Sequence, residues 1–256
     1  MIKYLLVLAL LCNIANAAPV NITLTENNSV IFNDQVTSEL VSKKTLEIMS
    51  KSLKASPIYL VLDTPGGSVT AGLRFVDSIK SLGIPVHTIT IFAASMGYQF
   101  VQELGTRYII PSGTLMSHRG FLSGVSGQVP GELNSRVNHI QSILSGMSER
   151  ASKRVGMTKE AYDAAIVNEL WLNGNEAVDK KHADALANVK CADNLLRETY
   201  EQDVRTPFGI ATLQFSKCPL ISAPLSFKFN RSVKPEEIEK IKRAVELKRK
   251  NLNLIF

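Results

Sequence analysis

The chain has 256 residues, of which 29 are basic and 23 acidic, and its formal net charge is +6. This length is sufficient for one well-buried domain together with an appendage. The basic residues are concentrated near the C-terminus, where glutamates are interspersed among them. Such mixed charge is typical of a solvated helix face, so we expect no nucleic-acid partner. Contact of this helix with a membrane surface is the less favoured alternative.

The first 17 residues have the pattern of a secretory signal peptide. Lys3 precedes an apolar run that ends at Cys12, and residues 15–17 (Ala-Asn-Ala) supply the small-x-small pattern of a cleavage site. The run is too short to span a bilayer, and no later segment is apolar enough to do so. A leucine rather than a small residue precedes Cys12, which argues against a lipoprotein anchor. The sequence therefore predicts an exported protein, periplasmic or extracellular.

Apolar periodicity predicts alternating strands and helices in the first half of the mature chain. The predicted strands cover residues 20–24, 29–32, 58–63, 86–92 and 114–117, with a further strand that begins at Tyr108. The predicted helices cover residues 37–53, 68–81 and 96–104. Because helices separate the central strands, we expect an α/β fold with parallel strands.

Two turns rich in small residues follow neighbouring predicted strands. Residues 65–68 (Pro-Gly-Gly-Ser) follow the predicted strand at 58–63, and residues 93–97 (Ala-Ala-Ser-Met-Gly) follow the one at 86–92. Ligands bind at the carboxyl ends of parallel strands, so Gly67 and Ser95 are expected to lie close together. Glycines let backbone N–H groups approach a developing oxyanion, and a helix N-terminus favours the same anion. This arrangement suits acyl transfer with Ser95 as the nucleophile.

A nucleophilic serine needs a base, and His118 is the best-placed histidine. It follows the apolar run at residues 114–117, so it too is expected at a strand end. Imidazole can take the hydroxyl proton and return it to the leaving group. The other histidines are less well placed, because His87 lies within a strand and His139 within a long helix. His182 follows two lysines, which predicts an exposed position.

With these motifs the chain resembles the Clp protease proteolytic subunit family. The markers occur in one order over residues 30–184, namely TPGGSVTAG at 64–72, ASMG at 94–97, LMSH at 115–118 and EAV at 176–178. The resemblance implies an α/β fold, a Clp/crotonase-like ββα spiral that assembles into homo-oligomeric rings. It also implies that Ser95 is the nucleophile and His118 the base. The backbone N–H groups of Gly67 and Met96 would form the oxyanion hole.

The chain departs from the family pattern at two points. The family's third catalytic residue is an aspartate before the Glu-Ala-Val marker, and the matching position here holds Glu169. Glutamate can orient a histidine, but its longer side chain requires a shifted backbone. Asn168 and Asp163 are the alternatives for this role. The family's His-Gln-Pro is His-Arg-Gly at residues 118–120, which affects how substrate is held beside the histidine.

A loop rich in glycine and serine, residues 119–131, leads from the predicted base to a long helix at residues 132–155. We interpret the loop as a lid or a substrate-binding edge, with a plain connector as the alternative. The helix carries a heptad-like apolar stripe at Leu133, Val137, Ile140, Leu144, Met147 and Ala151. By resemblance this is the handle helix that joins two rings. The stripe therefore predicts an oligomer interface or, alternatively, packing against the helix's own domain.

The resemblance divides the mature chain into a Clp protease-like peptidase domain, residues 18–190, and a C-terminal appendage, residues 191–256. The appendage is expected to contain strands at residues 211–215 and 225–229. A terminal helix is expected to begin at Pro235.

The mature chain keeps two cysteines, Cys191 and Cys218. In an exported protein they are expected to form a disulfide, and two separate buried thiols are the alternative. Two cysteines without nearby histidines supply too few ligands for zinc, so no metal site is expected.

The sequence favours a serine-type endopeptidase that cleaves peptides or unfolded proteins through an acyl-enzyme intermediate and uses no cofactor. Export argues against a cytosolic ATPase partner. One alternative is a signal-peptide-peptidase-like enzyme of the same fold with a Ser-Lys pair, in which Lys153 or Lys159 is the base. Another is an oligomeric scaffold with weakened catalysis. Coenzyme A chemistry of the crotonase kind lacks support, because only the fold is shared.

We predict that export removes residues 1–17. N-terminal sequencing of the exported protein is expected to begin at Ala18, because cleavage follows the small-x-small tripeptide. An exported chain that still contains Lys3 would contradict this.

Overall fold

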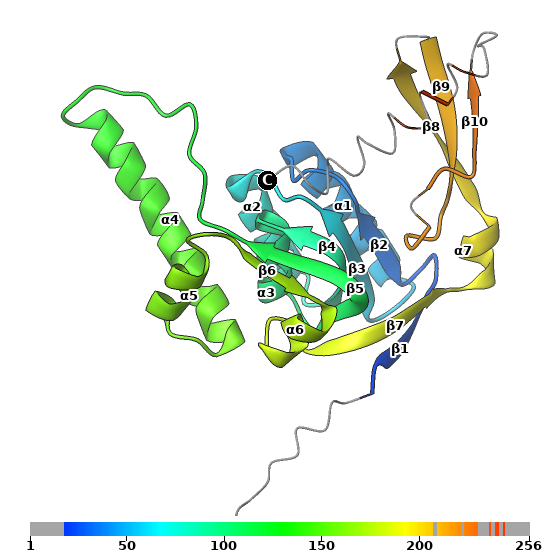
Figure 1. Cartoon of the computed structure of the whole chain (residues 1–256), viewed down its shortest axis with the longest axis horizontal. Coiled ribbons are helices and arrows are strands. Elements are labelled where there is room, and N and C mark those ends of the chain that lie inside the picture. Colours follow the sequence, from blue (N-terminus) through cyan, green and yellow to red (C-terminus); the bar gives the residue numbers. More distant parts are fainter. Residues whose placement is uncertain are drawn as a thin grey trace, which may run out of the picture.

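The computed structural model describes residues 18–206, 209–221 and 223–229, and positions 236, 239, 240 and 243. The predicted signal peptide and most of the predicted terminal helix lie outside the described residues. Figure 1 shows a central sheet, with a long helix at one end and a small separate sheet at the other. None of the helices within the described ranges is both long and apolar enough to cross a membrane.

Strands and helices alternate through most of the chain, as the sequence predicts. In chain order the elements are β1 (Val20–Leu24), β2 (Ser29–Phe32), α1 (Ser38–Ser52), β3 (Ile58–Thr64), α2 (Val69–Ser81), β4 (Val86–Ala94), α3 (Met96–Glu103), β5 (Arg107–Ser117), α4 (Glu132–Val155), α5 (Lys159–Ala165), β6 (Leu170–Asn173), α6 (Gly174–Asp179), β7 (Ala185–Cys191), α7 (Asp193–Arg197), β8 (Thr199–Thr206), β9 (Gly209–Ser216) and β10 (Ser226–Phe229).

The main sheet has seven strands and is mostly parallel. Six of them lie in the order β1-β7-β5-β4-β3-β2, with every neighbouring pair parallel, and β6 pairs antiparallel with β5. Helices α2 and α3 connect β3 to β4 and β4 to β5, so the carboxyl ends of these three strands meet at one edge. The mixed α/β sheet confirms the predicted fold class.

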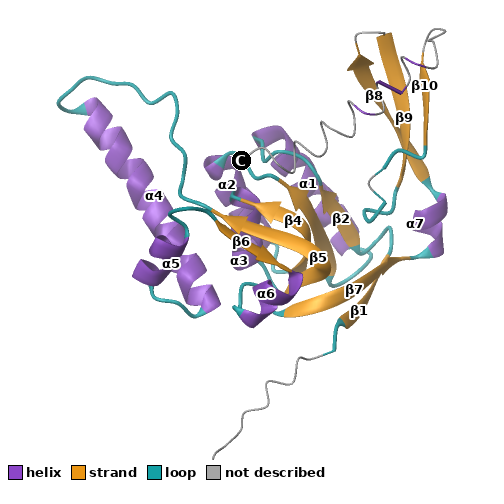
Figure 2. Cartoon of the chain, viewed as in Figure 1, coloured by secondary structure: helices purple, strands orange, loops and turns teal. Residues whose placement is uncertain are grey.

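Helices α1 and α2 each begin after a residue whose hydroxyl caps the first turn. The hydroxyl of Thr37 accepts a hydrogen bond from the N–H of Leu40 at 3.2 Å, and that of Ser68 accepts one from the N–H of Ala71 at 3.3 Å. Each bond satisfies a backbone donor that the first helical turn leaves without a partner. Figure 2 shows α1, α2 and α3 along the same side of the strands.

A cluster of three buried phenylalanines holds α2 and α3 against the sheet. The ring centroids of Phe32, Phe75 and Phe100 lie 5.1 to 5.7 Å apart. Such aromatic pairs each contribute about 0.5–1.5 kcal/mol beyond the burial of their surface. Because Phe100 belongs to α3, the cluster fixes the helix that starts directly after Ser95.

The sequence predicts some elements only in part. The strand expected at Tyr108 and the run at residues 114–117 are one strand, β5, whose register against β4 shifts between Thr90 and Phe92. Elements α5, β6, α6, β7 and α7 are not predicted at all. The three helices have seven residues or fewer, too few for a helical period to be recognised.

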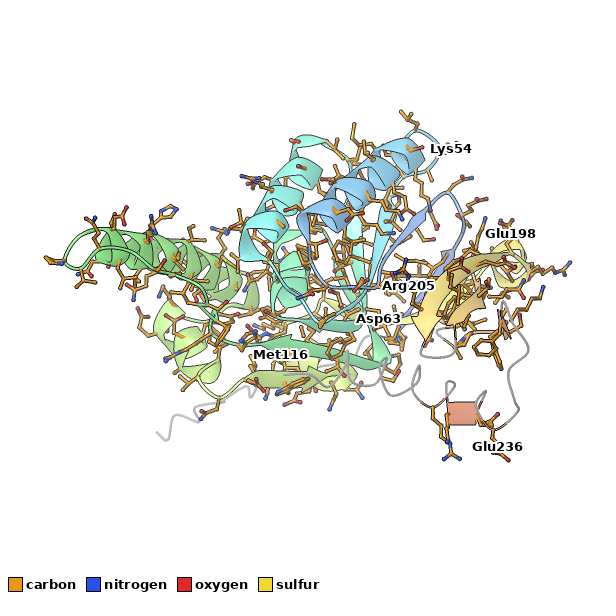
Figure 3. The ribbon with its side chains drawn as sticks, turned by 90° about the horizontal axis from the view of Figure 1, so that it is seen from above. Lys54, Asp63, Met116, Glu198, Arg205 and Glu236 are labelled. Carbon is orange, nitrogen blue, oxygen red and sulfur yellow. A yellow bond between two sulfur atoms is a disulfide. The ribbon has the colours of Figure 1, made fainter. Side chains whose placement is uncertain are left out.

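Helix α4 has the predicted bounds, and its apolar stripe divides into two parts. Met147, Ala151 and Val155 are buried, and this end of α4 packs against α3 and α5. Near the N-terminal end Leu133 and Ile140 are only half-buried. Viewed from above in Figure 3, α4 extends away from the body at the end opposite the small sheet. The C-terminal part of the stripe therefore packs against its own domain.

The appendage contains a separate antiparallel sheet in the order β10-β9-β8. Strands β9 and β10 are the two that the sequence predicts: β9 extends beyond residues 211–215 at both ends, and β10 begins one residue later than predicted. Strand β8 is not predicted, because its sequence (Thr-Tyr-Glu-Gln-Asp-Val-Arg-Thr) is dominated by polar and charged residues. Cys191 at the end of β7 and Cys218 after β9 form the expected disulfide, with Cα atoms 5.9 Å apart and both residues buried.

Removal of this disulfide is expected to lower the free energy of unfolding by roughly 3–4 kcal/mol, because the bridge restricts the unfolded chain between two cysteines 27 positions apart. Denaturant titration of the mature wild type and of Cys218→Ser measures the difference. Thiol titration of the unfolded, unreduced mature protein is expected to find no free thiol. Two titratable thiols would show that packing alone holds the appendage.

Candidate active site

Ser95 is the single residue between β4 and α3, and its backbone is strained. Its φ is 55° and its ψ is −116°, a region that residues other than glycine seldom adopt. Its N–H donates to the carbonyl of Met116 on β5 at 2.9 Å, which ties the turn to the next strand. Its side chain makes no hydrogen bond that caps α3. Ser95 is therefore not an ordinary capping serine, and the turn resembles the sharp strand-to-helix turn of serine hydrolases.

Gly66 and Gly67 bring a second backbone segment against this turn. Their φ angles are 89° and 146°. A Cβ at Gly66 would lie 2.6 Å from the Cβ of Ser95, and a Cβ at Gly67 would lie 2.7 Å from the carbonyl oxygen of Val36. Val36 donates to the carbonyl of Gly66 at 2.8 Å and accepts from the N–H of Ser68 at 2.9 Å. The segment is thus held on both sides of Gly67, and the glycines allow the close backbone approach that an oxyanion hole requires.

Ser95 and His118 line the same pocket, which has a volume of about 510 Å³. Its other walls come from α4 and α5, with further contributions from α2, α3 and the start of the loop after His118. Met96 also lines the pocket, whereas Gly67 does not. His118 follows the last residue of β5 and is half-buried. In the described part of the chain no hydrogen bond joins the Ser95 hydroxyl to the His118 ring. Such bonds often form only when substrate is bound.

Glu169 lies outside this pocket. It is exposed, and its carboxylate accepts a hydrogen bond from the indole N–H of Trp171 at 3.0 Å. Its backbone is nevertheless close to that of the predicted base. Ser117 pairs with Leu170 across the antiparallel β5–β6 ladder, so His118 and Glu169 are the next residues outward on the two strands. The structure therefore brings the two backbones together but directs the carboxylate to Trp171. Glu169 also has a positive φ, 64°.

Asp163 on α5 is the carboxylate that lines the pocket with His118. It forms an ion pair with Lys159 at 2.6 Å. Partial burial acts to raise the pKa of Asp163, but hydrogen bonds from Lys159 and Ser148 and the charge of Lys159 outweigh it, so the pKa lies below its usual value. The remaining alternative, Asn168, is exposed and does not line the pocket.

The two lysines considered as bases have carboxylate partners. The hydrogen bond to Asp163 raises the pKa of Lys159, which keeps its ammonium protonated. Lys153 pairs with Glu149 at 2.6 Å and lines a different groove. A general base must lose its proton near neutral pH, so neither environment suits a Ser-Lys pair.

A buried polar cluster beneath the pocket is not predicted by the sequence. The hydroxyls of Ser117 and Tyr162 are 2.8 Å apart, and the Tyr98 hydroxyl is hydrogen-bonded to Nδ1 of His182 at 2.7 Å. The expectation that His182 is exposed is wrong, since the residue is 2% exposed. Burial, together with the charges of Arg107 and Lys180, lowers the pKa of His182 to about 4. No sequence period indicates this burial, because the histidine follows a short helix.

Comparison with known proteins shows the family. A family model described as Clp protease matches residues 16–188, which excludes the whole appendage. The chain belongs to the Clp protease family. It is a serine-type peptidase and therefore a hydrolase. In the residues that the structure describes, no three His, Cys, Asp or Glu side chains are grouped so as to hold a metal ion.

Three relatives are named ATP-dependent Clp protease proteolytic subunit 1. The protein of Chlamydia pneumoniae is 32% identical over 164 residues, which cover 61% of this chain and 84% of the relative. That of Chlamydia muridarum is 28% identical over 162 residues, with the same coverage of both chains. That of Protochlamydia amoebophila is 27% identical over 168 residues, covering 64% of this chain and 82% of the relative.

Glu169 can orient His118 only if its carboxylate turns from the Trp171 indole to the neighbouring strand end, and in that case Glu169→Gln is expected to lower kcat/KM for a peptide substrate by about 10²–10⁴-fold. If the carboxylate stays on Trp171, the same change is expected to cost less than about threefold. Asp163→Asn is the matched control and is expected to change kcat/KM by less than about threefold, since it removes only a half-exposed ion pair. Steady-state kinetics of the two variants decide between the carboxylates. The reverse ranking would assign the orienting role to Asp163.

Proposed function

We propose that this Clp protease family member hydrolyses peptide bonds through an acyl-enzyme intermediate on Ser95. The observation that carries the proposal is the strained turn at Ser95. The Ser95 hydroxyl does not cap α3, and Ser95 lines the same pocket as His118. A serine that capped the helix would satisfy a backbone donor and would not need a positive φ.

The proposed reaction uses Ser95, His118 and backbone N–H groups near this turn. His118 takes the proton of the Ser95 hydroxyl as the oxygen attacks the scissile carbonyl. The negative charge that develops on the carbonyl oxygen is stabilised by the N–H groups of Gly67 and Met96 and by the N-terminal end of α3. His118 then gives the proton to the leaving amine. Water, activated by the same histidine, releases the acyl group, and Glu169 is the proposed orienting carboxylate.

The proposed substrates are peptides or unfolded proteins, cleaved outside the cytosol without an ATPase partner. The support is the predicted signal peptide, which is followed directly by the family domain. The relatives are named ATP-dependent proteases, so peptide cleavage without ATP would distinguish this chain from them.

We also propose that the chain acts as a homo-oligomeric ring. The relatives are named as subunits, and the N-terminal part of α4 presents half-buried apolar residues, among them Leu133 and Ile140. A scaffold that has lost turnover is the less favoured reading, because a strained turn without a reaction would only reduce stability.

Ser95→Ala is expected to abolish both peptide hydrolysis and covalent labelling by a fluorophosphonate probe, because it removes the attacking oxygen. His118→Ala is expected to come close to this loss, since a serine hydroxyl without its base is a weak nucleophile. Ser112→Ala, at an exposed position on β5, is the matched control and should be labelled like the wild type. Mass spectrometry of the labelled protein identifies the modified residue. Turnover by Ser95→Ala near the wild-type rate would refute the proposed function.

A further inference from the structure

A pair of buried hydroxyls connects the strand that ends at His118 to helix α5. Ser117 is the last residue of β5 and is 2% exposed, while Tyr162 on α5 is fully buried. Their oxygens are 2.8 Å apart. Both residues are buried, and a buried hydroxyl without a partner is costly, so the Ser117 hydroxyl depends on Tyr162. The pair therefore fixes the distance between α5 and the end of β5.

The same tyrosine also contacts the helix that follows Ser95. The rings of Tyr162 and Tyr98 on α3 are stacked with centroids 6.4 Å apart. Gln99, the next residue of α3, lines the pocket together with Tyr162. The N–H of Gln99 in turn donates to the carbonyl of Ser95 at 3.3 Å. Tyr162 thus lies where α5, α3 and the end of β5 meet.

We infer that Ser117 and Tyr162 are positioning residues that set the place of His118 relative to Ser95. This inference rests on the proposed function. His118 is covalently attached to Ser117, and the loop that follows it is exposed, so the Ser117–Tyr162 bond is the nearest side-chain bond that holds the histidine's backbone. Proton transfer depends steeply on geometry, and a displacement of about 1 Å can cost about 10²-fold in rate.

The position of Tyr162 supports a role beyond general stability. Tyr162 lines the pocket together with Ser95 and His118, and Asp163 of the same helix and Ile166 directly after it also line this pocket. Loss of the hydroxyl pair would let this wall and the end of β5 move independently. The substrate-binding surface would remain, but the base would no longer be held at the nucleophile. The expected signature is therefore a loss in kcat rather than a rise in KM.

The test compares variants that remove one hydroxyl each. Tyr162→Phe and Ser117→Ala are each expected to lower kcat for a fluorogenic peptide by about tenfold, with KM within about twofold of wild type. The double variant should be no more than about threefold worse than either single variant, because the two hydroxyls act as one pair. Active-site titration with the fluorophosphonate normalises each rate to the folded, competent fraction.

Ser216→Ala is the matched control. Ser216 is 3% exposed, and its hydroxyl donates to the carbonyl of Leu195 in the appendage. The substitution therefore removes an equally buried hydroxyl that lies away from the pocket. Its kcat should stay within about twofold of wild type. Ser117→Thr keeps the hydroxyl and should retain kcat. If Ser117→Ala does not fold, the comparison of Ser117→Thr with Tyr162→Phe tests the inference instead.

The outcomes separate this inference from the proposed function. A labelled, active wild type whose Tyr162→Phe and Ser117→Ala variants keep wild-type kcat would overturn the inference alone. Multiplying losses in the double variant, or an equal loss in Ser216→Ala, would overturn it as well. A wild type that neither hydrolyses peptides nor reacts with the probe would overturn the proposed function and this inference together.

Discussion

The site depends on the close approach of two backbone turns, one at Gly66 and the other at Ser95. No side chain fits between them, since a Cβ at Gly66 would lie 2.6 Å from both the Ala94 carbonyl oxygen and the Ser95 Cβ. A Cβ at Gly97 would likewise lie 2.7 Å from a methyl carbon of Thr64. The parallel pairing of β3 with β4 brings the two turns to one edge, and small residues let them meet there.

This constraint explains how a short sequence signal specifies the geometry of the candidate site. Buried strands β3, β4 and β5 each deliver one segment to the same edge, and the phenylalanine cluster around Phe100 holds α3 in place behind Ser95. Helices α4 and α5 close the pocket from the other side. The covering wall is joined to the sheet by polar contacts at Ser117 and Tyr162, so its position depends on specific hydrogen bonds as well as on apolar packing.

Much of this could be predicted from the sequence, because strand ends and turns are local features. The apolar runs before Gly66 and Ser95 predict where two strands end, and the structure places these residues directly beyond β3 and β4. The direction of a side chain is not local. Counting back from the Glu-Ala-Val marker selects Glu169, but only the structure shows that its backbone lies beside His118 in the ladder and that its carboxylate contacts Trp171. Burial of His182 depends on contacts with distant elements, which no period reveals.

The most direct test of the account is a crystal structure of the protein after reaction with a fluorophosphonate. The account predicts a covalent bond between phosphorus and the Ser95 oxygen. It also predicts a phosphonyl oxygen about 2.7–3.1 Å from the backbone nitrogens of Gly67 and Met96, because this oxygen occupies the place of the developing oxyanion. A label on another side chain, or a phosphonyl oxygen that faces solvent instead of the two N–H groups, would contradict it.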